Sequence, residues 1–481
     1  MSYKSIHEQF VSGLNGTTLS EVSVQTAFGA ASIFLRDTSF LLFGVHSSKI
    51  DCWFQLALDF TLLVVPVLLA QTVLSDVSTQ LLIALCVCSL LTIPACIKQF
   101  YKNVNNSNQL SATSLLSTEM GMVRPFITNT RSFVLIATAI AILAVDFKIF
   151  PRRLAKTETF GSGLMDIGVG LFVFTNAIVS PEARGRHTHI SCFVNKCVAI
   201  IQSLKASLPL LILGLARMLA VKGANYQEHI TEYGVHWNFF ITLAVTKVLS
   251  TILFVIVDPM WSGPLSVVLA VFYQYWLSTC GLSQYIQLGL DGRGGRSGLI
   301  DANREGIYSC VGYLAIYLAG VLTGRFLFKK RTKLCDWLWF FVTLTTISTI
   351  LWCLLSYCVT AVQPISRRMA NTTYVMWIVA LGIFLVCTFL LEDLIITGLK
   401  SIVQFQRSDK EQKQQGLLAA VTFNGLLYFL LANIFTGVIN MTVSTIYASP
   451  TTAFGIIVIY MFVLSAIVMT LFRRNISTKC W

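Results

Sequence analysis

Charged residues gather between Ile140 and Asn176, where an apolar segment is followed by a short polar one and then a second apolar segment. Asp146 ends the first apolar segment, and Lys156 follows ten residues later, beyond a Pro151 that prevents simple continuation of a helix. A carboxylate at such a place could accept a proton from a hydroxyl nucleophile, and a neighbouring ammonium could keep it ionised or stabilise a developing oxyanion. The simpler alternative is an ion pair that only neutralises Asp146 at a membrane edge.

Three further charged residues of this stretch are candidates for substrate binding or for support of the site. Arg152 and Arg153 directly follow the proline, and Asp166 lies near the start of the second apolar segment. A helix–turn–helix hairpin would bring Asp166 to the same end of a helix bundle as Asp146 and Lys156. Because ionisable groups at membrane depth are costly and usually face a polar interior, this density of charge predicts a functional site.

A second polar stretch, GANYQEHITEYGVHWNFF, combines acidic, histidine and aromatic side chains. Three of them, His229, Glu232 and His236, could share one helical face and so resemble a metal cluster, but the HExxH motif is missing and we predict no metal site. Aromatic residues beside His and Asn are common anchors at a membrane interface. Hydrogen bonding to a substrate head group is the alternative, with Glu228, His229, Glu232, His236, Trp237 and Asn238 as candidates.

A glycine-rich stretch, LGLDGRGGRSG at residues 288–298, invites comparison with phosphate-binding loops. Its backbone N–H groups and either Arg293 or Arg296 could cradle a phosphate. The stretch matches neither GxGxxG nor GxxxxGK[ST], however, so a flexible turn is the simpler interpretation.

Polar residues at the start of one apolar segment and inside another complete the set of candidates. ANREGI, residues 302–307, supplies Arg304 and Glu305, with Asn303 as a candidate N-cap. Inside the apolar segment 417–438, Asn433 could line a polar cavity or form an interhelical hydrogen bond. We include Asn303, Arg304, Glu305 and Asn433 among the predicted substrate-binding residues.

The elements that must position these residues are membrane helices. The 481 residues are 55% hydrophobic and only 12% charged, and this composition is too apolar for a soluble globular protein. We predict an all-α polytopic membrane bundle that forms a single integral domain over residues 1–481, without a separate soluble domain. About thirteen runs have the length of a membrane span: 22–45, 52–74, 79–97, 132–150, 161–180, 204–222, 238–257, 263–286, 307–328, 336–358, 373–391, 417–438 and 452–472.

The net charge of +13 and the 13 cysteines do not change this interpretation. The basic residues lie in short loops, where they orient helices and contact anionic lipid head groups, so we predict no nucleic-acid binding. The cysteines lie mostly inside apolar runs without metal-type spacing, which favours a role as small packing residues.

Basic residues in short loops are about twice as frequent on one face as on the other, which predicts a lumenal N-terminal segment, 1–21, and a cytosolic C-terminal tail, 473–481. The span at 204–222 is the least regular, because it contains Lys205, Pro209 and Arg217 and also resembles a helix lying on the membrane. With it counted as a span, the loops 151–161, 223–238, 288–306 and 363–373 share the lumenal face. Their mixed charges predict one shared polar site.

Five stretches, in the same order along the chain, resemble the inositol acyltransferase family of glycosylphosphatidylinositol (GPI) biosynthesis. This family includes the class W protein of animals and the GPI-anchored wall transfer protein of fungi. The similar stretches are FVSGLNGTT (10–18), AIAILAVDFKIFPRRLAKTETFGSGLMDIGVGLFVF (139–174), YQEHITEYGVHWNFF (226–240), ANREGI (302–307) and NGLLYFLLANIFTGVIN (424–440).

This resemblance implies an enzyme of the endoplasmic reticulum membrane that moves a fatty acyl group, typically palmitoyl, from acyl-CoA to the inositol of glucosaminyl-phosphatidylinositol. Acyl-CoA would be a co-substrate, with no tightly bound cofactor, and membrane lipid would surround the chain. Asp146 and Lys156 carry over as the catalytic pair, which suggests direct transfer with Asp146 as proton acceptor. A multispan lipid or small-molecule transporter or flippase is the alternative, because it would use intramembrane charges to pass a polar head group.

Overall fold

The structure is a computed structural model that describes residues 9–10, 12–43, 51–103, 119–120, 124–185, 193–223, 230–402 and 416–478. These residues form helices joined by turns, which confirms the predicted all-α class. Helices suit a membrane because they satisfy their backbone hydrogen bonds internally. The α-helices are α2 (Leu19–Leu42), α3 (Cys52–Asp59), α4 (Val65–Gln71), α5 (Ser78–Asn103), α7 (Pro125–Ala144), α8 (Ile167–Ile178), α9 (Phe193–Gly223), α10 (Ile230–Tyr233), α11 (Phe239–Ile256), α12 (Ser262–Thr279), α13 (Leu282–Leu288), α14 (Gly298–Ala302), α15 (Arg304–Phe328), α16 (Leu334–Ala361), α17 (Thr372–Ile402), α18 (Leu417–Phe423), α19 (Gly425–Thr442) and α20 (Pro450–Arg473).

Shorter elements connect or extend these helices. A π-helical segment, η2 (Phe60–Val64), joins α3 to α4 within one span. The 3₁₀ segments are η3 (Ser75–Val77), η4 (Arg152–Leu154), η5 (Leu164–Asp166), η6 (Pro259–Trp261) and η7 (Thr445–Tyr447).

Ten helices within the described residues are long and apolar enough to cross a membrane, and the number is eleven if α12 and α13 form one bent span. The span predicted at 204–222 belongs to this set as part of α9. The spans predicted at 22–45 and 161–180 correspond to α2 and α8, which fall outside the set. A polytopic membrane bundle is therefore confirmed, whereas the number thirteen stays a prediction.

Two predicted boundaries around the charged stretch differ from the structure. α7 ends at Ala144 instead of residue 150, because the chain turns there, with the N–H of Phe147 donating to the carbonyl of Ala144. α8 begins only at Ile167, so its 12 residues span about 18 Å at 1.5 Å per residue, less than the hydrocarbon core of a bilayer. The residues between these helices form a polar loop. The end of this loop takes the place of the first residues of the span predicted at 161–180.

The span predicted at 263–286 is broken. α12 and α13 meet at an angle of 69°. Gly281, between them, has φ +73°, a left-handed conformation that commonly ends a helix and favours glycine. The bend directs α13 and the glycine-rich loop that follows it toward α15.

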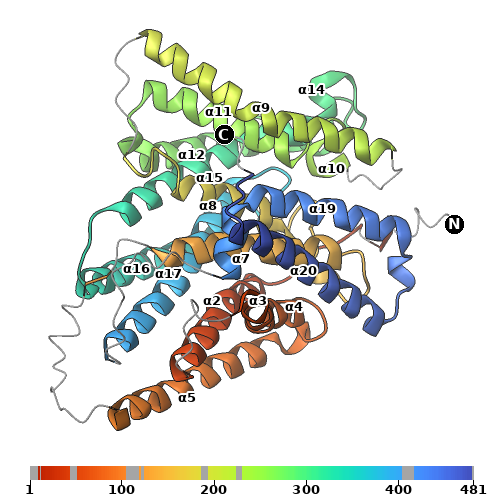
Figure 1. The fold of residues 1–481 in the computed structure, drawn as a ribbon. Coiled ribbons are helices and arrows are strands. Elements are labelled where there is room, and N and C mark those ends of the chain that lie inside the picture. Colours follow the sequence, from red (N-terminus) through yellow and green to blue (C-terminus); the bar gives the residue numbers. More distant parts are fainter. Residues whose placement is uncertain are drawn as a thin grey trace.

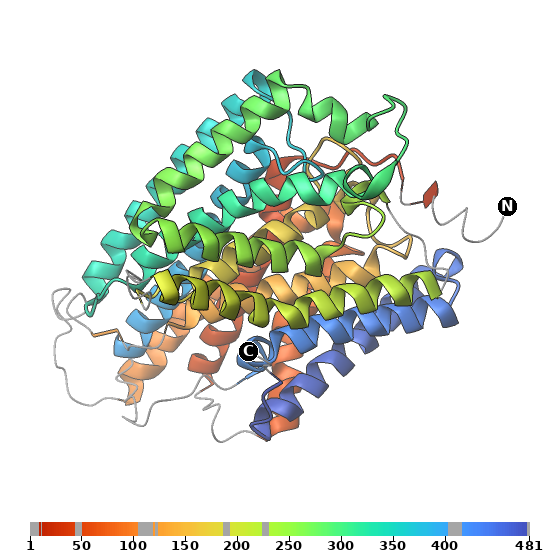
Figure 2. The ribbon, with the colours of Figure 1, turned by 90° about the horizontal axis from the view of Figure 1, so that it is seen from above.

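Helices α7 and α17 lie in the middle of the bundle, with α9, α11 and α12 on one side and α2 to α5 on the other (Figure 1). α17 completely buries Trp377, Leu381 and Leu385, and α7 packs against α8, α17 and α19. Seen from above, the yellow-green α9 runs across the view, whereas the green α12 slopes steeply (Figure 2). Small residues permit the close contact of α8 with α15, since a Cβ on Gly320 would lie 2.6 Å from the Cβ of Ala177.

Candidate functional site

The four polar loops predicted to share one face meet at one end of the bundle. The loop after α7 reaches α10 through Lys156 and Glu232, and the loop before α17 reaches the same carboxylate through Arg367. The N–H of Val235 donates to the carbonyl of Ala302, which joins the segment after α10 to α14. A shared polar region is therefore confirmed for the described residues, whereas its lumenal orientation stays a prediction.

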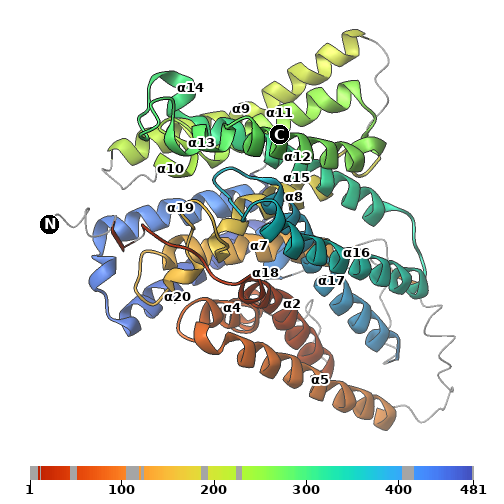
Figure 3. The same cartoon turned by 180° about the vertical axis from the view of Figure 1, so that it is seen from behind.

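The N-terminal segment belongs to the same region. It runs beside the loop between α7 and α8 (Figure 3), where the N–H of Thr17 donates to the carbonyl of Ser162 at 2.7 Å. The hydroxyl of Ser162 donates back to the carbonyl of Thr17 at 2.6 Å. Two stretches that carry the family resemblance are thus in direct contact.

Lys156, Glu232, Arg367 and Asp166 form a chain of alternating charges. Nζ of Lys156 lies 2.9 Å from Oε2 of Glu232, and Nη1 of Arg367 lies 3.1 Å from Oε1 of the same carboxylate. Nε of Arg367 lies 2.8 Å from Oδ1 of Asp166, and both of these side chains are buried. The Lys156 side chain is 40% exposed. This chain of charges therefore leads from the buried Arg367–Asp166 ion pair to an accessible ammonium group.

The surrounding charges fix the protonation state of Glu232. Burial by itself would raise the pKa of this carboxyl group, but Lys156 and Arg367 lower the pKa to about 2. A carboxylate with so low a pKa is ionised at neutral pH and is a weak proton acceptor. Glu232 is therefore better suited to hold Lys156, or to accept a hydrogen bond from a ligand, than to act as a general base.

Asp166 shapes the loop that carries Lys156. Its carboxylate accepts hydrogen bonds from the backbone N–H groups of Thr157, at 3.2 Å, and Gly163, at 2.8 Å. A Cβ on Gly163 would collide with the carbonyl oxygen of Ala155 and would lie 2.9 Å from the Asp166 carboxylate. Asp166 thus holds this loop through backbone hydrogen bonds and joins it to a second loop through an ion pair, and substrate binding by Asp166 stays a prediction.

A cavity of about 130 Å³ lies beside this chain of charges. Its charged lining residues are Lys156, Arg217, Glu232 and Arg367. A mixed lining of this kind suits a ligand with a polar head and a hydrocarbon part. The apolar lining comes mainly from α7, α8, α11 and α19, and includes Phe133, Val134, Ala137, Ala141, Ile142, Val169, Phe172, Phe239 and Phe429.

Asp146 lies outside the chain of charges. It is buried in the turn after α7, where its Oδ2 accepts a hydrogen bond from Nδ2 of Asn440 at 2.6 Å. Lys156 pairs with Glu232, so the ion pair with Asp146 considered from the sequence is not the contact that this lysine makes among the described residues. Asp146 is not among the described residues that line the cavity, and Ile142 is the last lining residue before it on α7.

Arg152 closes the turn that carries Asp146. Its Nη2 donates to the carbonyl oxygens of Val145 and Phe147, at 2.8 and 3.1 Å. Burial lowers the pKa of Arg152 to about 10, against the opposing effect of the nearby Asp146 carboxylate. Arg152 therefore supports the candidate site by fixing the backbone beneath it.

Arg153 has more exposed surroundings. Its Nε lies 2.9 Å from Glu21 and its Nη2 lies 2.6 Å from Asp76, with 38% of the arginine side chain exposed. These ion pairs join α2 and η3 to the loop after α7. Substrate binding by Arg153 stays a prediction.

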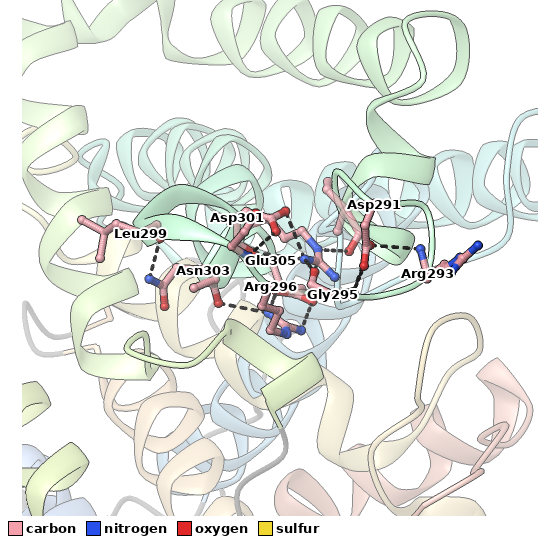
Figure 4. Close-up of polar contacts among 12 residues, drawn as sticks. Asp291, Arg293, Gly295, Arg296, Leu299, Asp301, Asn303 and Glu305 are labelled. Carbon is pink, nitrogen blue, oxygen red and sulfur yellow. Dashed lines mark hydrogen bonds and ion pairs between the residues drawn. The ribbon is translucent and has the colours of Figure 1, made fainter.

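A second group of charges surrounds Glu305 at the start of α15 (Figure 4). Nη2 of Arg296 lies 2.6 Å from Oε1 of Glu305, and Nη2 of Arg368 lies 2.8 Å from the same oxygen. Arg304 is buried against Asp301, at 3.1 Å, and against backbone carbonyl oxygens. These contacts hold α14, α15 and the loop before α17 together, and substrate binding by Arg304 and Glu305 stays a prediction.

The glycine-rich loop uses its N–H groups internally. The N–H groups of Arg293 and Gly295 both donate to the carboxylate of Asp291, each at 3.0 Å (Figure 4). The place that a phosphate could take beside these groups is thus occupied by a carboxylate of the loop itself. This geometry favours the flexible-turn interpretation over a phosphate-binding loop.

Asn303 occupies the predicted N-cap position of α15, but its side chain does not cap that helix. Its Oδ1 accepts from the N–H of His236 at 2.7 Å, and its Nδ2 donates to the carbonyl of Leu299 at 2.8 Å. The side chain therefore joins two loops of the polar region.

Trp237 and Asn238 organise the start of α11. Asn238 accepts from the N–H of Phe240 and donates to the carbonyl of Gly214 at 2.8 Å, while Trp237 donates to the hydroxyl of Thr242 at 2.9 Å. Both residues have structural partners, and their contact with substrate stays a prediction. The candidates Glu228 and His229 lie outside the described residues.

Comparison with known proteins shows the family of this chain. The GWT1 family model matches residues 3–471. The chain belongs to the GWT1 family. It is 34% identical to the glucosaminyl-phosphatidylinositol-acyltransferase PIGW of Bos taurus over the full length of both chains, and 36% identical to the GPI-anchored wall transfer protein 1 of Gibberella zeae over 99% of each. It is also 34% identical to the phosphatidylinositol-glycan biosynthesis class W protein of Dictyostelium discoideum, over 100% of this chain and 99% of that one.

In this GWT1-family chain, Asn433 lines the cavity, as one of its two interpretations predicted. Its Nδ2 donates to the carbonyl of Phe429 within α19 at 2.8 Å. One face of this helix therefore connects the cavity, through Asn433, with the partner of Asp146, through Asn440.

The cavity lining includes residues that were not predicted for the site, among them Arg217, Arg367, Gln25 and Gln71. Arg217 interrupts an apolar span, and Arg367 lies in a loop already noted for its charge. The sequence could therefore have identified both as charged residues near the membrane. Gln25 and Gln71 are single uncharged residues inside apolar runs, and no sequence pattern distinguished them.

Proposed function

We propose that this protein transfers a fatty acyl group to the inositol of glucosaminyl-phosphatidylinositol in GPI-anchor biosynthesis, with acyl-CoA, typically palmitoyl-CoA, as the donor. Full-length similarity to relatives named as this acyltransferase supports the reaction class. The observation that carries the proposal is the cavity, which combines an accessible ammonium group with an apolar wall. An acyl thioester and a phospholipid both need such a combination.

The proposed chemistry is direct transfer. An inositol hydroxyl oxygen forms the new ester bond with the thioester carbonyl carbon, the carbon–sulfur bond breaks, and coenzyme A leaves as a thiol after taking up a proton. Asp146 would accept the proton from the hydroxyl, and Asn440 would hold the carboxylate in orientation. Lys156, held by Glu232, would stabilise the negative charge that develops on the carbonyl oxygen.

The proposed setting is the endoplasmic reticulum membrane, with the N-terminal segment and the polar loops on the lumenal side. The distribution of basic residues in the loops supports this orientation. Coenzyme A is made on the cytosolic side, so a lumenal site requires the acyl donor to reach it through the bundle. Labelling of single introduced cysteines in intact microsomes would test the orientation, and accessibility of residue 153 only after permeabilisation is the expected result.

Purified full-length protein in detergent tests the reaction. With palmitoyl-CoA and glucosaminyl-phosphatidylinositol, we expect mass spectrometry to detect the glycolipid with one added acyl chain and an equal amount of free coenzyme A. Omission of either substrate is the control. A transporter or flippase would release neither product, so failure to detect them with folded protein would contradict the proposal.

A further inference from the structure

Two glutamine side chains on the cavity wall have hydrogen-bonding atoms without partners in the described part of the chain. Gln25 on α2 and Gln71 at the end of α4 are fully buried and line the cavity. Nε2 of Gln25 donates to the carbonyl of Ala70 at 3.0 Å, which leaves its Oε1 unpaired. Both Oε1 and Nε2 of Gln71 lack a hydrogen-bond partner among the residues that the structure describes. The pair thus presents one donor group and two acceptor atoms.

Such atoms are unusual inside a protein. A buried donor or acceptor without a partner costs about 1–3 kcal/mol, and most buried polar groups are therefore hydrogen-bonded. Gln274 shows the ordinary arrangement in the same molecule. Its Nε2 donates to Ser278 and Gln363, and its Oε1 accepts from the N–H of Thr372. The contrast indicates that the amides on the cavity wall bind something other than the protein.

The charges of the cavity indicate which kind of ligand group these two amides bind. The formal charges of its lining belong to Lys156, Arg217, Glu232 and Arg367, whereas the amides of Gln25 and Gln71 are neutral. A neutral amide with a free donor and a free acceptor best matches a group that itself both donates and accepts. Phosphate only accepts, and an ammonium group only donates.

We propose that Gln25 and Gln71 form a neutral hydrogen-bonding subsite that positions a substrate group able both to donate and to accept. The inference rests on the proposed function, whose two substrates each contain such groups: the hydroxyls of the inositol acceptor and the secondary amides of the pantetheine arm of coenzyme A. Gln71, with both amide atoms unpaired, is the main positioning residue. Gln25 adds an acceptor oxygen. The hydrogen bond from Nε2 of Gln25 to the carbonyl of Ala70 fixes the orientation of this amide.

The test is Gln71→Leu in the purified full-length protein, with KM measured separately for palmitoyl-CoA and for glucosaminyl-phosphatidylinositol. Loss of one or two hydrogen bonds predicts a rise of about tenfold in one KM. A rise for the acceptor assigns the subsite to inositol, and a rise for the donor assigns it to pantetheine. Because leucine removes unpaired polar atoms, the melting temperature of the ligand-free protein should stay the same or rise. Gln71→Met provides a second variant if leucine does not fit.

Gln274→Leu is the matched control. It breaks satisfied hydrogen bonds away from the cavity, so we expect a lower melting temperature with both KM values unchanged. Unchanged KM values in the Gln71 variants, with normal wild-type turnover, would overturn the subsite alone. A lower melting temperature of Gln71→Leu with both KM values unchanged would assign this residue a merely structural role. A wild-type protein without turnover would overturn the proposed function first, and the subsite with it.

Discussion

The ammonium group of Lys156 lies 2.9 Å from the carboxylate of Glu232, a residue 76 positions further along the chain. Arg367 contacts the same carboxylate from a third loop. The Glu232 carboxylate, which Arg367 also holds, thus places an accessible lysine at the cavity. It also separates the roles of the acidic residues, because Glu232 is held ionised by two cations, whereas Asp146 lies with Asn440 at the end of α7.

The low pKa of Glu232 predicts an acid-dependent loss of stability. A carboxyl group whose pKa falls from 4.5 to about 2 on folding stabilises the protein above pH 4.5, and this contribution is lost as the pH falls toward 2. The shift corresponds to roughly 3 kcal/mol. We expect the melting temperature of the wild type to fall across this window, and that of Glu232→Gln to change less. Parallel curves for the two proteins would contradict the ion-pair geometry.

Arg367→Met should destabilise the fold strongly. The change leaves the buried carboxylate of Asp166 without its cation, and breaking one partner of a buried ion pair costs about 3–5 kcal/mol. Arg153→Met is the matched control, because this arginine is 38% exposed and an exposed pair contributes about 0–1 kcal/mol. Thermal unfolding in one detergent compares the two. Equal melting temperatures of the Arg367→Met and Arg153→Met proteins would show that Arg367 is not needed for the fold.

Asp146→Asn should leave the protein folded and reduce turnover at least a hundredfold, on the order expected for removal of a general base. Asparagine has nearly the same shape and keeps an oxygen that can accept from Asn440. The exposed Asp258→Asn is the control, with turnover expected to match the wild type. Near-normal turnover of Asp146→Asn would remove this residue from the proposed mechanism.

Gly163→Ala should lower turnover by displacing the segment that carries Lys156. The added methyl group would collide with the carbonyl of Ala155 beside the Asp166 carboxylate. Gly398→Ala in α17 is the control, because its Cβ meets nothing within 4 Å and alanine favours a helix by about 1 kcal/mol. We expect normal turnover and equal or higher stability for the control. Normal turnover in both variants would show that the position of this loop does not matter.

Hydropathy predicted most of the helices, because a membrane span must be apolar over its whole length. It did not predict where α7 ends or α8 begins. Those ends are set by hydrogen bonds from Arg152 to the carbonyls after α7 and from Thr157 and Gly163 to Asp166. Such contacts depend on side-chain direction, which periodicity does not contain.

The candidate site was predicted in part. Four loops were expected to share a polar region from their charge, and they do so, and Lys156 and Glu232 were each named as candidates. Their pairing was not foreseen, because contacts between residues far apart in the chain, such as the 201 positions between Asp166 and Arg367, leave no local pattern. The lining glutamines were missed for the same reason.

Inositol acylation by purified Lys156→Met, beside the wild type, tests the central claim most directly. Methionine keeps the length of the lysine stem without its charge, so the cavity should persist while the cation is lost. With palmitoyl-CoA and glucosaminyl-phosphatidylinositol, we predict acylated product from the wild type and at least a hundredfold less from the variant, at a melting temperature that shows it folded. Equal rates of product formation by the two proteins would contradict the assignment of this cavity as the site of acyl transfer.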